Sequence, residues 1–269
     1  MINLSISRTL DLILLFVAVF AISSTGGVAA QPADTIVAQD GSGDYTSIQN
    51  AVDDANDTDR IEIQTGKYKE SIYIDKNVTI ITTKSATIAN ASTVADRSAI
   101  EISKSAKPVI DGIDITGWMI GIEADFSENN WKIRNVTIDN TTRGINAFNS
   151  NSWEIANTTI EAEDVGISLS RNNGAPVITK THISDSTLGI IARRTSGEPL
   201  IRETIIKNVS SGISMFKSTG ESKIVDTKIE NVDDGVGAYK SSGNWRIENT
   251  TITSVSDDAV SAGTATGDW

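Results

Sequence analysis

Cysteine is absent from the sequence of 269 residues, and histidine occurs only once. These gaps exclude a disulfide-stapled small domain and the familiar zinc or copper sites built from Cys or several His ligands. Positive charge is also in the minority, because 23 Lys and Arg stand against 35 Asp and Glu, which gives a formal net charge of −12. Such a chain is not a bulk electropositive binder of nucleic acid, so we expect no nucleic-acid partner. Aromatic residues make up only 5% of the chain, so its core must come from aliphatic side chains.

Residues 1–30 have the pattern of a signal peptide for export. Arg8 precedes an apolar run over residues 12–22, and small residues then lead to Val28-Ala29-Ala30, which fits a cleavage site. The run is shorter than the about 20 residues that a membrane anchor needs. We therefore expect a secreted or cell-surface protein that is not an integral membrane protein after cleavage, with a buried N-terminal helix as the alternative. An acidic surface also suits a halophile, although plain solubility explains it equally well.

A spacing of 22 to 24 residues organises most of the chain. One column pairs Gly with Ile or Val: Gly121-Ile122, Gly144-Ile145, Gly166-Ile167, Gly189-Ile190, Gly212-Ile213 and Gly235-Val236. Two isoleucine columns keep the same step, one from Ile110 to Ile247 and the other from Ile115 to Ile252. Each repeat therefore supplies three short β-branched stretches and no helical spacing, which predicts a solenoid with three strands per coil.

Stacked coils place like residues on like, with parallel strands about 4.8 Å apart, so the isoleucine columns fill the interior. A bend must separate the two columns, because the odd spacing from Ile133 to Ile138 would otherwise point them to opposite faces. Asn135, Asn157 and Asn249 stand at this bend, and Asn tolerates the left-handed conformation of a tight corner. This pattern resembles the right-handed parallel β-helix family of pectin-lyase-like repeat proteins. The resemblance implies an all-β, right-handed parallel β-helix solenoid with about 23 residues per coil.

The repeat divides the chain into a signal peptide at 1–30, an N-terminal strand and capping helix at 31–60, and the parallel β-helix at 61–269. The helix is expected over residues 45–56, where apolar residues share one helical face. No comparable cap follows Val260, although an open solenoid end exposes unpaired strand edges. We expect that this end is either truncated at Trp269 or docks onto another chain.

The first coils resemble the opening of the pectin methylesterases. The stretches at 36–52, 61–63, 66–70 and 77–80 carry this resemblance, which extends over residues 36–90. It is specific for architecture, since the same opening occurs in β-helix surface proteins without esterase activity. The esterases' later motifs, which supply two Asp, a Gln pair and an Arg, do not occur in this sequence.

Two pairs of aspartates are weak candidates for chemistry: Asp233, Asp234, Asp257 and Asp258. The first pair resembles the Asp pair of polygalacturonases, which need a general acid and a base beside a glycosidic bond. Four carboxylates on adjacent coils are also a candidate Ca²⁺ site, since Ca²⁺ prefers several oxygen ligands. The polygalacturonases' Gly-His-Gly and Arg-Ile-Lys companions are missing, and Asp is favoured in turns. Solvated turn residues are therefore the first interpretation.

A stripe of aromatic and basic residues is the main candidate site. The residue two positions after the Gly-linked Ile is apolar and faces inward, so the next one faces solvent. The stripe consists of Phe148, Arg171, Arg193, Arg194, Phe216, Lys217, Tyr239 and Lys240. Aromatic rings stack on sugar rings, while guanidinium and ammonium groups pair with uronate or sulfate. The stripe therefore predicts a groove for an acidic polysaccharide rich in uronate.

Three tryptophans and the histidine have structural interpretations. Trp131, Trp153 and Trp245 share a column two residues before an isoleucine, which predicts packing inside or at a corner, with a carbohydrate platform as the alternative. His182 alternates with an inward isoleucine, so we expect it at the surface.

Several Asn-x-Ser/Thr sequons occur, and in an exported protein such sites accept N-glycans. The predicted corner explains Asn135, Asn157 and Asn249 without a glycan. The expected glycosylation sites are Asn56, Asn77, Asn90, Asn140 and Asn208.

These features favour an exported or cell-surface β-helix repeat protein that is non-catalytic and binds an acidic polysaccharide or acts as a structural surface module. The alternative is a polysaccharide-active enzyme: a pectinesterase-like carbohydrate esterase, a polygalacturonase-like glycoside hydrolase or a polysaccharide lyase. No cofactor is expected other than the alternative of Ca²⁺.

Overall fold

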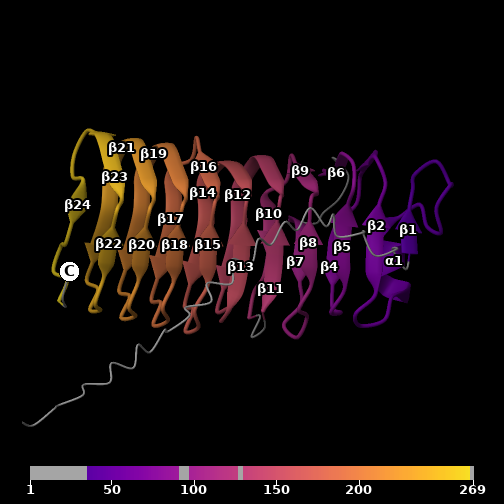
Figure 1. Ribbon diagram of the computed structural model, residues 1–269, viewed down its shortest axis with the longest axis horizontal. Helices are drawn as coiled ribbons and strands as arrows, with labels where there is room; N and C mark the ends of the chain where they lie inside the picture. Colours follow the sequence, from indigo (N-terminus) through magenta and orange to yellow (C-terminus); the bar gives the residue numbers. More distant parts are fainter. Residues whose placement is uncertain (1–34, 91–96, 127–129, 267–269) are drawn as a thin grey trace, which may run out of the picture. The chain divides into compact units, whose positions relative to one another are not determined.

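The computed structural model describes residues 35–90, 97–126 and 130–266, which wind into a parallel β-helix (Figure 1). The predicted signal peptide and Trp269 lie outside the described residues. Within those ranges, no helix has the length and hydrophobicity required to cross a bilayer.

The first sheet has ten parallel strands, one from each coil, and they stack in chain order. They are β1 (Thr35–Val37), β2 (Arg60–Ile63), β5 (Thr79–Thr82), β8 (Val109–Asp111), β11 (Trp131–Arg134), β13 (Trp153–Ala156), β15 (Val177–Thr179), β18 (Leu200–Arg202), β20 (Lys223–Val225) and β22 (Arg246–Glu248). This sheet carries the first isoleucine column.

The second sheet bends over a corner and forms the other two faces of each coil. Its strands are β3 (Gly66–Tyr68), β4 (Ile72–Ile74), β6 (Ala86–Ala89), β7 (Ser98–Ile102), β9 (Asp114–Thr116), β10 (Ile120–Glu123), β12 (Thr137–Phe148), β14 (Thr159–Ser170), β16 (His182–Ser184), β17 (Leu188–Arg193), β19 (Ile205–Phe216), β21 (Lys228–Tyr239), β23 (Thr251–Val255) and β24 (Val260–Ser261). One of these faces carries the second isoleucine column, and the other, which we call the Gly-Ile face, carries the Gly-Ile column.

The predicted columns pair in register and form the core. Ile133 on β11 pairs with Ile155 on β13, and both are fully buried. Ile138 on β12 likewise pairs with Ile160 on β14. Burying one such side chain contributes about 1.5–3 kcal/mol, so the repeated columns supply the main stabilisation of the solenoid. The parallel β-helix solenoid predicted from the spacing is therefore confirmed.

Left-handed backbone marks the corners of the coils. Asn135 and Asn157 have φ of 53° and 50°, as predicted, and the Asn157 side-chain amide donates to Asn135 Oδ1 at 2.6 Å. A second corner carries Asn140 and Asn208, with φ of 49° and 54°. A third corner, after the Gly-Ile face, holds the residues of positive φ Phe126, Asn149, Arg171, Arg194, Lys217 and Lys240. Only the first of these corners was predicted from the sequence.

The Gly-Ile column exists because neighbouring coils leave no room for a side chain there. A Cβ added to Gly144 would lie 2.4 Å from Cγ2 of Ile160 and 2.5 Å from the carbonyl oxygen of Gly166. Any side chain at this position would push adjacent coils apart, so glycine is required for the close stacking.

The N-terminal coil is covered by the predicted helix, α1 (Ile48–Asp54). Ser47 caps it, and Glu70 accepts hydrogen bonds from Ser47 Oγ at 2.6 Å and from the Ile48 backbone at 2.8 Å. Ile48 and Val52 are buried against the first coils. β1 pairs with β2, so the strand expected ahead of the β-helix belongs to its first coil.

In the last described coil, the core columns are less covered than elsewhere. Ile247 and Ile252 are only partly buried, and Val260 is 49% exposed. Docking of a partner at this end stays a prediction.

Candidate functional site

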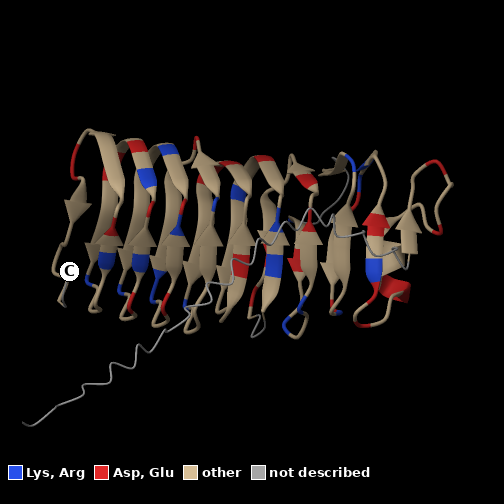
Figure 2. Ribbon diagram, viewed as in Figure 1, with Lys and Arg blue, Asp and Glu red and all other residues tan. Residues whose placement is uncertain are grey.

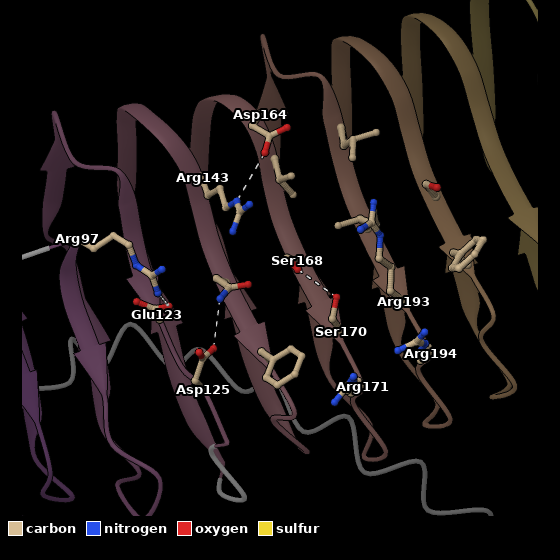
Figure 3. Close-up of a pocket in the computed structure, with 17 residues that line it drawn as sticks. Arg97, Glu123, Asp125, Arg143, Asp164, Ser168, Ser170, Arg171, Arg193 and Arg194 are labelled. Atoms are coloured by element: carbon tan, nitrogen blue, oxygen red, sulfur yellow. Dashed lines mark hydrogen bonds and ion pairs between the residues drawn. The ribbon is translucent and has the colours of Figure 1, made fainter.

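An open groove of about 900 Å³ runs across the coils on the Gly-Ile face. Strands β10, β12, β14, β17 and β19 contribute its outward side chains, one strand from each successive coil (Figure 3). Five arginines line it: Arg97, Arg143, Arg171, Arg193 and Arg194. Acidic and basic residues are interspersed along the coils (Figure 2), so this gathering of arginines is a local feature of an acidic chain.

Three apolar residues form part of the floor of the groove. Ile191 lies between the inward residues Ile190 and Ala192 and therefore at an outward position, yet it is only 5% exposed. Val165 also lines the groove and is 7% exposed. Leu188 pairs with Val165 in register and lies beside them. Sequence reasoning missed these residues, although the apolar Ile191 at an outward position was an available signal. A floor of this kind accepts the C–H face of a sugar ring.

The predicted stripe forms one wall of the groove and continues beyond it. Arg171 lies over the ring of Phe148, 5.1 Å from its centroid. Further along, Phe216 and Tyr239 stack with centroids 5.6 Å apart and an interplanar angle of 13°. Each of these two rings also carries the ammonium group of the following lysine, at 5.2 Å over Phe216 and 4.9 Å over Tyr239.

Only some residues of the stripe line the groove, and the others lie beside it. Its members that line the groove are Phe148, Arg171, Arg193, Arg194 and Phe216. The other members continue the same columns towards the C-terminal end of the β-helix but do not line the groove: Lys217, Tyr239 and Lys240. The structure thus brings the predicted stripe together, while ligand binding by it stays a prediction.

Carboxylates, which the sequence analysis did not single out, close the N-terminal end of the groove. Arg97 Nη2 lies 2.6 Å from Glu123 Oε1, and Ser98 Oγ donates to the other carboxylate oxygen. Asp125 accepts a hydrogen bond from the Asn146 amide at 3.2 Å (Figure 3). Burial, and then the neighbouring charge of Glu123, raises the pKa of Asp125 to about 6. The sequence did hold a signal for this pair, because Glu123 and Asp125 stand on either side of the inward Ala124 and must therefore face outward.

Arg143 faces the groove from the opposite side. Its Nε lies 3.6 Å from a carboxylate oxygen of Asp164, and both side chains are about half exposed. An exposed ion pair of this kind contributes little to stability. The guanidinium therefore keeps free donors for an anion in the groove.

The candidate aspartates of the last coils lie away from this groove. Asp233 and Asp234 belong to strand β21, so the expectation of a turn is wrong for this pair. Asp233 accepts from Ser256 Oγ at 2.7 Å, and Asp257 and Asp258 are exposed. Nowhere in the described ranges do three or more acidic or imidazole side chains converge as a metal site would require. Ca²⁺ binding by these four residues stays a prediction.

The tryptophans pack as predicted. Trp131 and Trp153 are 0% and 3% exposed and stack with centroids 5.0 Å apart. Trp245 is also buried, so none of the three offers a carbohydrate platform. His182 is only partly exposed, and burial lowers its pKa, so the expectation of a simple surface residue was incomplete.

The candidate glycosylation sites occupy different environments. Asn56, Asn90, Asn140 and Asn208 are exposed. The left-handed corner explains Asn140 and Asn208 as it explains Asn135, so the distinction drawn from the sequence does not hold for them. The Asn77 amide is partly buried and donates to Asp57 at 3.0 Å. Glycosylation of all five stays a prediction.

Comparisons with known proteins bear on the fold. A family model described as "Right handed beta helix region" matches residues 120–267, more than half of the 269 residues. Comparison of the sequence with curated proteins gives no match.

Several solved structures resemble the chain. The pectate lyase Pel9A superimposes with a TM-score of 0.60 at 10% identity, covering 79% of this chain and 72% of that one. A pectin methylesterase from carrot superimposes with a TM-score of 0.60 at 14% identity, covering 85% of this chain and 88% of that one. Escherichia coli YbhC superimposes with a TM-score of 0.54 at 14% identity, covering 84% of this chain and 86% of that one. Identities this low show a shared fold alone.

Proposed function

The chain belongs to the right-handed β-helix family, and from this fold and its groove we propose that it binds an acidic polysaccharide along the Gly-Ile face. One observation carries the proposal: arginines, aromatic rings and an apolar floor share a single elongated groove. Two of the similar structures are, by name, a pectate lyase and a pectin methylesterase, which makes a polysaccharide ligand plausible for the same architecture.

Each part of the groove suits one part of an acidic sugar. Arg143 and Arg193 are exposed guanidinium groups, which pair with carboxylate or sulfate through two parallel hydrogen bonds. The rings of Phe148 and Phe216 are partly exposed and offer faces for sugar rings. Because the groove crosses successive coils, a linear glycan would lie along the axis of the β-helix and meet a new set of side chains on each coil.

We propose that the protein binds this glycan without cleaving it, as a secreted or cell-surface module. Export rests on the signal pattern of residues 1–30. A second candidate, turnover of the polysaccharide, is favoured by one observation, the carboxyl group of Asp125 with its raised pKa at the end of the groove. A carboxyl that titrates near neutral pH is suited to proton transfer.

Calorimetric titration with oligogalacturonate and with alginate oligosaccharides tests the binding. The double variant Arg193→Ala/Phe216→Ala removes one charge-assisted contact and one ring, so we expect affinity to fall about 10- to 100-fold. Lys223→Ala removes an exposed positive charge from β20 on the first sheet and should leave affinity unchanged. An equal loss in both variants would mean that the groove is not the site.

Product analysis on the same mixtures separates binding from turnover. Lyase activity releases unsaturated uronates, hydrolysis releases new reducing ends, and esterase activity on pectin releases methanol. We expect none of these products above the level of a heat-denatured control. Product formation that Asp125→Asn abolishes would instead establish the enzymatic alternative.

A further inference from the structure

The third corner of the coils carries a column of positive charge, which we call the corner ladder. Its members stand on four successive coils and are all exposed: Arg171, Arg194, Lys217 and Lys240. Backbone hydrogen bonds stack these corners coil upon coil. The Arg194 amide donates to the Phe216 carbonyl at 2.8 Å, and the Lys217 amide donates to the Tyr239 carbonyl at 3.0 Å. The backbone therefore advances about 4.8 Å from one member of the ladder to the next.

The ladder has no carboxylate partners among the described residues. None of the ion pairs found there involves one of its members. Glu198 and Glu221 follow Arg194 and Lys217 by four positions, but Glu221 accepts instead from the Asn244 amide at 3.3 Å. Like charges that stand opposite one another on neighbouring strands are destabilising. The fold alone therefore does not favour this column, whereas an anionic partner would remove its repulsion.

Aromatic rings orient most of the ladder. Three of its members lie over a ring: Arg171 over Phe148, Lys217 over Phe216, and Lys240 over Tyr239. A cation placed over a ring keeps its charge while its side chain is held in one direction. Because these cations are oriented before a ligand arrives, binding loses less side-chain entropy.

The ladder begins at the β14 coil and runs toward the C-terminal end of the β-helix. On the two coils before it, the same corner holds the uncharged residues Phe126 and Asn149, and the outward carboxyl of Asp125 precedes Phe126. A polyanion is therefore repelled at the β10 coil and attracted from the β14 coil onward. The attractive part extends past the groove, because Lys217 and Lys240 do not line it.

Resting on the proposed function, we infer that the site extends beyond the groove along the corner ladder and binds a run of at least four consecutive uronate units. Such a run carries one carboxylate on each sugar. The coil spacing of about 4.8 Å is close to the length of one pyranose unit, so the run and the ladder have similar numbers of charges per unit length. The long side chains of Arg and Lys can reach carboxylates on either side of the sugar chain. Lys217 and Lys240 then determine how long a charged run binds best.

Calorimetric titrations with oligogalacturonates and oligomannuronates of two and four units test this inference. Because further carboxylates gain charge-assisted contacts with the ladder, we expect the tetramer to bind about tenfold more tightly than the dimer. Equal affinity for dimer and tetramer would overturn the inference and leave the proposed function intact. If no oligomer of either polymer binds, the proposed function itself fails, and the inference fails with it.

The double variant Lys217→Asn/Lys240→Asn separates the ladder from the groove. Asn149 occupies the same corner with φ of 51°, so these substitutions keep the left-handed backbone. We expect the tetramer to lose about tenfold in affinity and the dimer less than about twofold, because the arginines of the groove suffice to hold a dimer. Retained binding of the dimer also shows that the variant is folded.

The double variant Lys180→Asn/Lys223→Asn is the matched control, because it changes the net charge equally. Lys180 stands at the first corner with φ of 50°, and Lys223 is exposed on the first sheet. Both affinities should stay within about twofold of wild type. If the ladder variant loses dimer and tetramer binding equally, or if it behaves like the control, the ladder does not contact the ligand and the inference is wrong.

Discussion

The ring of Phe216 stacks almost parallel on the ring of Tyr239, one coil further along, because their strands pair in register. Only Phe216 lines the groove, and Tyr239 supports it from the flank. The stacking orients the Phe216 ring, so the two aromatic residues have different roles in ligand binding.

Tyr239→Ala should therefore reduce affinity for oligogalacturonate less than Phe216→Ala does. Loss of the supporting ring removes a pair interaction of about 0.5–1.5 kcal/mol, only part of which acts on the ligand, so we expect about a twofold to threefold loss. Loss of the contacting ring should cost about tenfold. Calorimetric titration of both variants measures the difference, and a larger loss for Tyr239→Ala would contradict the assignment.

Gly144→Ala should strongly destabilise the β-helix. The added methyl group would lie 2.4 Å from a carbon of Ile160 and 2.5 Å from a backbone oxygen, so two coils must separate. Overpacking of this kind costs about 1–3 kcal/mol or more of unfolding free energy. Urea denaturation followed by circular dichroism measures the cost.

Gly237→Ala is the matched control for that experiment. Its added methyl group would approach no closer than 3.3 Å, to the flexible hydroxyl of Ser261. We expect a change of less than about 1 kcal/mol. Equal destabilisation by both variants would show that close stacking is not the reason for the Gly-Ile column.

The fold could be predicted from the sequence because its constraints repeat every coil. Each of three columns has its residue type fixed by one constraint. The interior requires an apolar residue at Ile133, the corner favours Asn at Asn135, and close stacking of the coils requires glycine at Gly144. The second and third corners were harder to predict. Arg171 and Lys217 adopt the left-handed conformation with φ of 58° and 53°, although neither residue type favours it. The geometry of the coil overrides local preference at these positions.

The site could be predicted only in part, because only some of its residues belong to columns that repeat from coil to coil. Alternation along a strand placed Phe148 and Arg193 outward, and the repeat stacked them. The pairing of Arg97 with Glu123 joins residues that are 26 positions apart, outside the 22- to 24-residue step, so no column indicates it. Ile191 is buried although it stands at an outward position, and alternation alone does not predict this burial.

Affinity for an acidic oligosaccharide should fall as ionic strength rises. The groove arginines are exposed or lie at its rim, where salt screens charge interactions within about 10 Å at 0.1 M. Raising NaCl from about 0.05 to about 0.5 M should weaken binding about tenfold, while binding of a neutral probe stays constant. Titrations across this range test the point, and a salt-independent affinity would exclude pairing with the arginines.

The raised pKa of Asp125 predicts a pH dependence of both binding and stability. The groups that face this carboxyl are Glu123, Glu101, Arg97, the Asn146 amide and the backbone of Phe148. Between the ordinary value of 3.8 and about 6, the folded protein holds a proton that the unfolded chain has released. The contribution of this group to stability is therefore largest below that window and is lost as pH rises through 6.

Lowering the pH from 7 to 5 should accordingly tighten binding of a fully charged oligogalacturonate, because protonation of Asp125 removes a repelling charge. Asp125→Asn should bind it equally well at both pH values and should also lose the matching pH dependence of its unfolding free energy relative to wild type. Because the arginines stay charged throughout, the difference between wild type and variant isolates this one carboxyl. Titrations and urea denaturation at pH 5 and 7 measure both effects. Parallel pH profiles for the two proteins would show that Asp125 is ionised across the whole range and that its burial does not control the groove.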